Sequence, residues 1–147
     1  MRGFTLIELL VVVGISIVLA IVATPIYGGL QVRAQLNETS AQLSQTLRTA
    51  QQRSLSGYGN SAHGVKLQSQ GYILFQGDSY ALRQSAYDRG IDLAESLSLL
   101  LSLTGGVDEV VFSLSSGLPS ATGTINLIHS VDGNRQISIN DLGMVSE

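Results

Sequence analysis

The N-terminal residues contain an apolar run that is long enough to cross a membrane as a single helix. Between Phe4 and Tyr27 the only acidic or basic side chain is that of Glu8. A helix rises about 1.5 Å per residue, so about 20 apolar residues span a hydrocarbon core about 30 Å thick. The sequence therefore predicts a membrane-spanning helix over residues 4–27. Pro25 lacks a backbone N–H group and is expected to bend this helix.

Glu8 places a carboxylate inside the apolar run, where a charge is costly unless a cation neutralises it. Arg2 is the only basic residue before Glu8, and no basic residue follows within the run. Cleavage of the chain between Gly3 and Phe4 would create an α-amino group four residues before Glu8. We expect such an amine to serve as the partner of the Glu8 carboxylate in a neighbouring copy.

The six residues from Gly3 to Glu8, which read GFTLIE after a short basic leader, resemble the class III signal of type IV pilins and type II secretion pseudopilins. The resemblance implies a leader over residues 1–3, cleavage by prepilin peptidase after Gly3, and N-methylation of Phe4. It assigns Glu8 and Thr5 to assembly, with the Glu8 carboxylate paired to the amine of an adjacent subunit. Pro25 also matches a common pilin position.

Two other N-terminal signals fit the run less well. A secretory signal peptide has an apolar region of about 7 to 15 residues and a small-residue cleavage site after it. The run here is longer and carries Glu8 near its start. A plain signal anchor explains the length and Arg2, but it leaves the Glu8 carboxylate without a partner.

The length and composition leave room for the anchor and one small domain. The chain has 147 residues and a formal charge of −3, and loss of Arg2 with the leader would leave seven basic against eleven acidic side chains, or −4. A surface that binds nucleic acid is normally basic, so this balance argues against such a partner. The sequence has no cysteine, which excludes disulfides and thiolate metal sites. Many major pilins close a C-terminal loop with a disulfide, and this chain departs from that pattern.

Residues 28–56 are predicted to continue the helix as an amphipathic half. Apolar residues recur there on one helical face, with polar residues on the rest of the surface: Val32, Leu36, Leu43, Leu47, Ala50 and Leu55. Gly57, Gly59 and Asn60 then favour the end of the helix. We expect the stripe to pack against a β-rich globular head over residues 57–147, as in a pilin.

The head is predicted to be a mainly antiparallel β-sheet, which makes the chain an α+β protein. Alternating apolar and polar residues predict strands from His63, at Gly71–Gln76, Ser79–Gln84 and Val110–Leu114, and around the pairs Ile125/Leu127 and Ile137/Ile139. Asp132-Gly133 predicts a two-residue hairpin turn. Leu93–Leu103 fits a strand or a helix, and the following Gly105-Gly106 favours the strand. An exposed strand of this kind is prone to aggregate unless a neighbouring subunit covers it.

The order of elements in the head resembles the H-type minor pseudopilins of type II secretion and the related FimT-type minor pilins. The resemblance rests on the helix ending LRTAQQRS at 47–54, VFS at 111–113 before GLP at 117–119, GTI at 123–125, and RQISIN at 135–140 followed by LGMV at 142–145. In some FimT-type pilins, arginines after the C-terminal glycine bind DNA. Here Gly143 is followed by Met144, Val145, Ser146 and Glu147, so a nucleic-acid partner is disfavoured. Scattered arginines, at 83, 89 and 135, are the remaining candidates for such a site.

Signals for catalysis or metal binding are weak. Ser61 and His63 form a near miss to the G-x-S-x-G elbow, but the spacing is wrong and the segment is read as a helix-to-strand loop. His129 is far from His63 in the sequence, and both are read as ordinary polar residues of loops or strands. Oxygen ligands surround the last hairpin without the spacing of a calcium loop, and turn chemistry explains them better: Asp132, Asn134, Asn140 and Asp141.

The sequence therefore predicts a non-enzymatic structural subunit of a type IV pilus or a type II secretion pseudopilus, without cofactor, catalytic residue or metal. Its expected partners are other pilin or pseudopilin subunits, prepilin peptidase, the inner-membrane assembly machinery and, before assembly, membrane lipid. It is expected in the inner membrane first and then in a fibre in the periplasm or at the cell surface. The alternative is a minor pilin whose head binds DNA or another ligand in uptake or adhesion. A third alternative is an anchored periplasmic domain that never polymerises.

Overall fold

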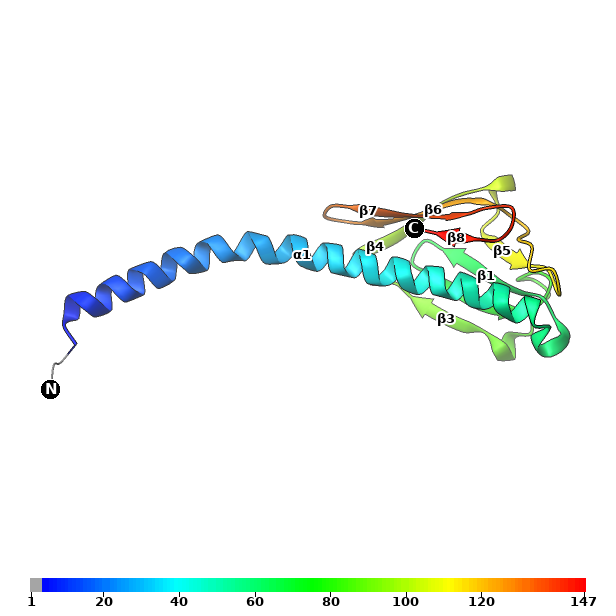
Figure 1. Ribbon diagram of the computed structural model, residues 1–147, viewed down its shortest axis with the longest axis horizontal. Helices are drawn as coiled ribbons and strands as arrows, with labels where there is room; N and C mark the ends of the chain where they lie inside the picture. Colours follow the sequence, from blue (N-terminus) through cyan, green and yellow to red (C-terminus); the bar gives the residue numbers. More distant parts are fainter. Residues whose placement is uncertain (1–3) are drawn as a thin grey trace. The chain divides into compact units, whose positions relative to one another are not determined.

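The structure is a computed structural model that describes residues 4–147, except for the side chains of residues 22–27. The chain divides into two compact units, Met1–Ala34 and Gln35–Glu147, and each unit is described by itself. One long helix, α1 (Leu6–Leu55), contributes residues to both units (Figure 1). The remaining elements all belong to the second unit.

In the first unit the described side chains of α1 are mostly apolar and exposed. The large apolar side chains between Phe4 and Ile21 are between 48% (Val13) and 81% (Leu6) exposed. Among the described residues, no helical segment combines the length and the apolar character that crossing a membrane requires. The expected span of residues 4–27 includes residues 22–27, whose side chains lie outside the description.

In the second unit α1 buries one face, as its amphipathic pattern predicts. Leu36, Leu43, Leu47 and Ala50 are at most 2% exposed. Three serines share this buried face: Ser40, Ser44 and Ser54. Two members of the predicted stripe differ, because Val32 belongs to the first unit and Leu55, the last helical residue, is 49% exposed.

The helix ends where glycine supplies a left-handed backbone. Gly57 has φ of 67° and is followed by a short 3-10 helix, η1 (Tyr58–Asn60). Non-glycine residues rarely adopt positive φ, and Asn is among those that do so most readily. Asn60 has φ of 50°. The predicted stop signal is confirmed.

The first sheet, sheet A, has the strand order β3-β2-β1-β5 and is antiparallel throughout. Its strands are β1 (His63–Gln68), β2 (Gly71–Gln76), β3 (Arg89–Asp92) and β5 (Glu109–Phe112). In β1 and β2, His63 pairs with Gln76 and Gln68 pairs with Gly71, so a two-residue turn joins them. Its buried apolar side chains include Val65, Leu67, Tyr72, Leu74, Phe75, Val110, Val111 and Phe112.

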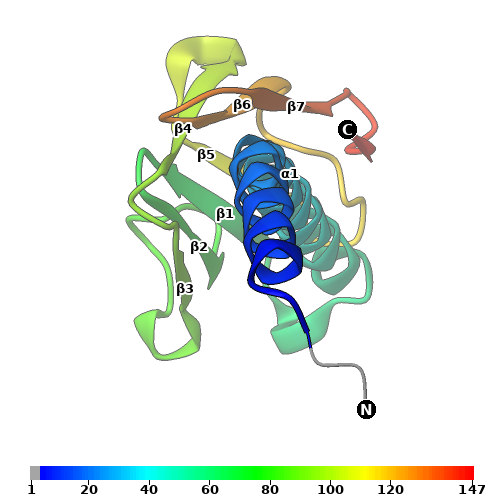
Figure 2. The same ribbon diagram turned by 90° about the vertical axis from the view of Figure 1, so that its left-hand side faces the viewer.

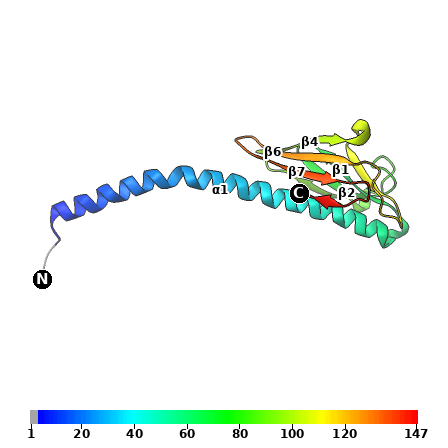
Figure 3. The ribbon, with the colours of Figure 1, turned by 45° about the horizontal axis from the view of Figure 1, so that its top comes forward.

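The second sheet, sheet B, has the order β4-β6-β7-β8 and is also antiparallel. Its strands are β4 (Leu97–Leu103), β6 (Gly123–His129), β7 (Asn134–Ile139) and β8 (Val145–Ser146), and η3 (Thr104–Gly106) follows β4. Alternate residues face the core: Leu97, Leu99, Leu103, Ile125, Leu127, Ile137 and Ile139. Both sheets lie beside the second half of α1 (Figure 2), and β6 and β7 run along it (Figure 3). The expectation of an α+β chain with an antiparallel head is confirmed, with two sheets in place of one.

Polar side chains of α1 tie it to both sheets. Ser54 Oγ accepts a hydrogen bond of 2.9 Å from the backbone N–H of His63 in β1. On the other side, Arg48 Nη2 donates to the Val145 carbonyl in β8 at 2.9 Å, and Arg135 Nε of β7 donates to Asn37 Oδ1 at 2.8 Å. The helix therefore positions the two sheets through specific bonds as well as through its apolar face.

The predicted strand at Ser79–Gln84 is wrong. These residues form a loop before η2 (Ser85–Tyr87), and the next strand along the chain to pair with β2 is β3. Gly77 has φ of 148°, and a Cβ at Gly77 would lie 2.8 Å from Cα of Arg83, so the loop closes tightly on itself. Arg83 holds it closed, because Nε donates to Asp88 Oδ2 at 2.7 Å and Nη1 donates to the Tyr80 carbonyl at 2.9 Å.

Two further predictions for sheet B are confirmed only in part. The strand in Leu93–Leu103 is present but begins at Leu97. The last hairpin is present, but its loop is longer than the predicted two-residue turn, since Ile128 pairs with Asn134. The reason is local, because His129 Nδ1 accepts from Val131 N–H at 3.1 Å and folds the loop before Asp132 is reached.

Candidate functional site

The described N-terminal end of α1 is held by the threonine of the GFTLIE motif. Thr5 precedes the first helical residue, and its Oγ1 accepts a long hydrogen bond of 3.4 Å from the backbone N–H of Glu8. A threonine at this position satisfies one of the N–H groups that a helix start leaves without a partner. Phe4, one residue earlier, is 80% exposed.

The Glu8 side chain also lies in the first turn of the helix, where its residue type favours the helix start. The pattern Thr5-x-x-Glu8 is the capping-box pattern, in which a threonine at the helix start is followed three residues later by a glutamate. A carboxylate in the first turn of a helix also interacts favourably with the helix dipole. The side chain that is predicted to serve assembly therefore also lies where it can stabilise the helix start, and its assembly role stays a prediction.

Two predicted positions, Gly3 and Pro25, are not fully described. Gly3, the expected cleavage position, lies outside the described residues, together with the rest of the leader at 1–3. Pro25 falls within the bounds of α1, but its side chain lies outside the description. Cleavage, N-methylation of Phe4 and the bend at Pro25 stay predictions.

The arginines considered for nucleic-acid binding make different contacts within the head. Arg83 is paired with Asp88 in the loop after β2, and Arg135 donates to Asn37 from sheet B. Arg89 begins β3 in sheet A and lines a pocket with Arg53 of α1. The guanidinium groups of Arg83 and Arg135 therefore already have protein partners.

The two histidines lie in different sheets, and the hydroxyl of Ser61 bonds to a backbone carbonyl. Ser61 Oγ donates to the carbonyl of Ala62, and His129 ends β6 in sheet B. His63 begins β1, is 1% exposed, and has no hydrogen-bond partner on either ring nitrogen in the described part of the chain. Its reading as an ordinary polar residue is wrong in this respect, because its imidazole lies in the core beside the Tyr58 ring, with centroids 5.9 Å apart. Burial, and to a smaller extent the Arg53 cation, lower the pKa of His63.

The oxygen ligands near the C-terminus are divided between the two ends of β7. Asp132 and Asn134 lie at its start, while Asn140 and Asp141 follow its end. Asn140 Oδ1 accepts from the N–H groups of Leu142 and Met144, at 3.1 and 2.8 Å, which is turn chemistry. Among the described residues no group of three or more histidine, cysteine, aspartate or glutamate residues is arranged to hold a metal ion.

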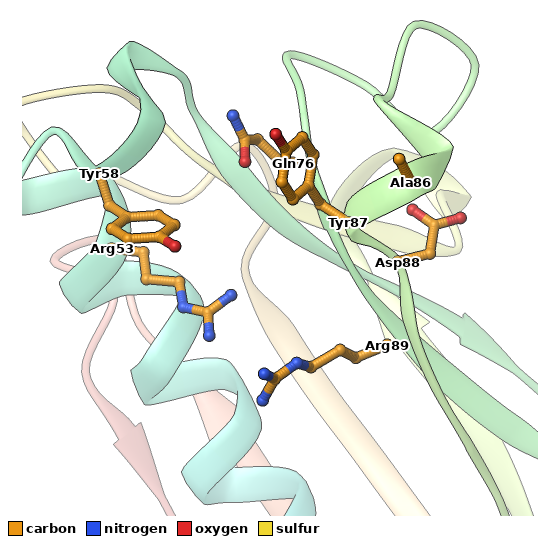
Figure 4. Close-up of a pocket in the computed structure, with 7 residues that line it drawn as sticks. All are labelled: Arg53, Tyr58, Gln76, Ala86, Tyr87, Asp88 and Arg89. Carbon is orange, nitrogen blue, oxygen red and sulfur yellow. The ribbon is translucent and has the colours of Figure 1, made fainter.

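The head contains a pocket that the sequence reading did not find. It has a volume of about 210 Å³ and lies beside the last turns of α1, lined by Arg53, Tyr58, Gln76, Ala86, Tyr87, Asp88 and Arg89 (Figure 4). A second pocket of about 250 Å³ shares Arg53 and Arg89 with it. The residues that line this pocket come from separate parts of the sequence, so no local motif predicts it.

Solved structures share this fold. The type IV minor pilin FimU of Pseudomonas aeruginosa aligns with a TM-score of 0.60 and 20% identity, over 80% of this chain and 90% of FimU. Two structures of the minor pseudopilin EpsH from the type 2 secretion system of Vibrio cholerae align with TM-scores of 0.60 and 0.61 and identities of 15% and 16%. They cover 76% and 78% of this chain and 94% of EpsH. No protein-family model matches the sequence, and no curated protein matches it. The predicted resemblance of the head to H-type minor pseudopilins and minor pilins is confirmed at the level of the fold.

Proposed function

We propose that this chain is a non-enzymatic structural subunit of a type IV pilus or a type II secretion pseudopilus. The observation that carries the proposal is an apolar helix with exposed side chains, which bears one carboxylate in its first turn and continues into a head with the fold of minor pilins and pseudopilins. In this proposal prepilin peptidase removes residues 1–3, Phe4 is N-methylated, and the inner-membrane machinery packs the helix against those of other subunits.

The apolar helix needs an environment that the described chain does not supply. From Leu6 to Ile21 it is apolar on all sides, apart from Glu8, Gly14 and Ser16. A helix of this kind is normally buried in a protein core or in lipid. Membrane lipid before assembly, and neighbouring helices in a fibre afterwards, would cover these side chains in turn.

In this proposal the Glu8 carboxylate determines how neighbouring helices pack, because it needs a cationic partner. A carboxylate surrounded by apolar side chains is costly unless a cation pairs with it. Cleavage after Gly3 would expose the amine of Phe4 at the end of the same helix, and the amine of one subunit would pair with Glu8 of the next. The proposed fibre lies in the periplasm or at the cell surface.

The first experiment is mass spectrometry of the N-terminal peptide, recovered from the membrane and from the sheared surface fraction of a host with an active prepilin peptidase. A chain that begins at Phe4 with one N-methyl group supports the proposal. A chain that still begins at Met1 contradicts it and leaves a plain membrane anchor.

The second experiment separates the two roles of Glu8. Glu8→Gln keeps a capping side chain at the third helical position but removes the charge, whereas Glu8→Asp keeps the charge. If charge pairing drives assembly, Glu8→Gln subunits enter the membrane normally but are largely lost from the fibre fraction, and Glu8→Asp subunits retain part of their assembly. Normal incorporation of Glu8→Gln would show that the charge pair is not needed.

A further inference from the structure

Two arginine side chains line the same pocket in the head. Arg53 comes from the last turn of α1 and Arg89 from the start of β3, and both line the 210 Å³ pocket. In Figure 4 their guanidinium groups point into the space between the helix and the strand. Within the part of the chain that the structure describes, neither has an ion-pair partner or a hydrogen-bond acceptor for its side chain. Two like charges at one pocket repel each other, and a bound anion relieves that repulsion.

The carboxylate that lines this pocket, that of Asp88, already has a partner. Asp88 lines the same pocket, but its Oδ2 accepts from Arg83 Nε at 2.7 Å. Its Oδ1 is buried without a hydrogen-bond donor, and in Figure 4 the carboxylate points away from the two guanidinium groups. Arg83 therefore neutralises Asp88, and the positive charges of Arg53 and Arg89 remain.

An aromatic residue of the pocket holds one of these cations in place. The Arg53 guanidinium lies 5.5 Å from the centroid of the Tyr58 ring, and that ring rests against the buried His63. A cation over an aromatic face is stabilised by the ring quadrupole. Tyr58 and Tyr87 are each more than half exposed, so their rings form the open wall of the pocket.

The second pocket extends this site along α1. It shares Arg53 and Arg89, and it adds the apolar side chains Leu74 and Ile91 opposite polar residues of the helix, Thr46 and Thr49 among them. A small inorganic anion needs only the two arginines, whereas a peptide also uses an apolar floor beside them. The combined groove of about 210 and 250 Å³ suits a short segment of polypeptide.

We propose that the Arg53–Arg89 groove binds an acidic peptide segment of a partner protein, with one aspartate or glutamate carboxylate on the two guanidinium groups. Arginine pairs with carboxylates through charge-assisted and often bidentate hydrogen bonds. The groove offers two uncompensated cations on a chain whose net charge is −3, which suits one carboxylate better than a polyanion such as nucleic acid. This inference goes beyond the fibre role and does not depend on it.

The test uses the full chain in detergent micelles and an acetylated, amidated hexapeptide with one central glutamate flanked by leucine and alanine. Binding is followed by NMR through the side-chain N–H signals of the arginines. We expect saturable shifts at Arg53 and Arg89. Loss of one charge-assisted contact is worth about 1.5–3 kcal/mol, so Arg89→Gln is expected to weaken binding at least about tenfold. Arg89→Lys is expected to weaken it less.

Arg135→Gln is the matched control, because Arg135 donates to Asn37 in sheet B and does not line the groove. It should bind the peptide as the unchanged chain does. Equal binding by Arg89→Gln, or equal binding of the same peptide with glutamine in place of glutamate, overturns the proposal. Tighter binding of inorganic phosphate overturns it in favour of a small-anion site, and tighter binding of a single-stranded oligonucleotide overturns it in favour of nucleic acid. These outcomes are independent of N-terminal processing, so this proposal and the fibre role fail separately.

Discussion

The two ends of α1 place their apolar side chains in opposite environments. From Leu6 to Ile21 such side chains occupy all sides of the helix and are exposed, as at Leu10, which is 64% exposed. From Leu36 to Ala50 they lie on one face and are buried, as at Leu47, which is 0% exposed. Both stretches are helical, so the difference is one of partners and not of backbone conformation.

This contrast shows for which part of α1 the chain itself supplies the surface that covers the apolar side chains. The second stretch finds its covering surface in the strands of sheets A and B, which the same chain supplies. The described first stretch exposes apolar side chains, and in the proposed function lipid or other subunits cover them. Stability of the head and assembly of the fibre are therefore expected to respond to different residues.

The largest expected effect on the free energy of unfolding comes from replacing a leucine by alanine, and it should differ between the two stretches of α1. Leu47→Ala removes a fully buried side chain and should lower the free energy of unfolding of the head by about 2–5 kcal/mol. Leu10→Ala, at an exposed position, should change it by less than about 0.5 kcal/mol. Urea unfolding of the full chain in micelles, followed by tyrosine fluorescence, measures both. Equal losses of unfolding free energy in the two variants would contradict the proposed difference between the two stretches of α1.

A smaller loss of stability is expected when a serine is replaced by alanine, and it should again depend on the stretch of α1 in which the serine lies. Ser54→Ala leaves the N–H of His63 without the Oγ acceptor that now lies 2.9 Å away, and a buried donor without an acceptor costs about 1–3 kcal/mol. Ser16→Ala is the control, because Ser16 Oγ only donates to the Val12 carbonyl at 2.8 Å on an exposed surface. The same unfolding measurement should show a clear loss for Ser54→Ala alone. A loss of the same size for Ser16→Ala would show that the bond to β1 is not the cause.

The head is also expected to weaken in mild acid. Because the pKa of His63 is lowered by burial and by Arg53, the folded head binds fewer protons than the unfolded chain. Its stability is therefore complete above the unfolded pKa of about 6.5 and falls as the pH decreases toward the folded pKa. Unfolding at about pH 7.5 and about pH 5, on either side of that value, measures this loss.

His63→Phe is expected to reduce the acid sensitivity, because the phenyl ring carries no titratable group. His129→Asn is the control, since His129 lies at the end of β6 in the other sheet. If the pH dependence survived in His63→Phe and disappeared in His129→Asn, the assignment to His63 would be wrong.

The smallest expected effect is confined to the helix start. Thr5→Ala removes the oxygen that accepts from the Glu8 N–H, which costs about 1 kcal/mol of local helix stability. Amide hydrogen exchange at Glu8 should become faster, while urea unfolding of the head should stay unchanged. Thr49→Ala, which changes a threonine near the other end of the helix, should not affect exchange at Glu8.

Much of the fold follows from local patterns in the sequence. The apolar run, the stripe from Leu36 to Ala50 and the glycines after Leu55 predict α1 and its end, because helix formation depends on neighbours three and four residues apart. Alternation predicts β1, β2 and the paired strands around Ile125 and Ile137, because side chains two residues apart lie on the same face of a strand. The prediction failed at Ser79–Gln84, where contacts of Arg83 with Asp88 and Tyr80 close a loop that alternation alone presents as a strand.

The sequence by itself determined the apolar helix, its single carboxylate and the β-rich character of the head, since each depends on residue type and short-range spacing. Only the tertiary structure decided that the strands divide into two sheets, that His63 is buried, and that Arg53 and Arg89 line one pocket. Arg53 and Arg89 lie 36 positions apart, one on a helix and one on an edge strand. Their meeting depends on how α1 packs against sheet A, and no local pattern contains that information.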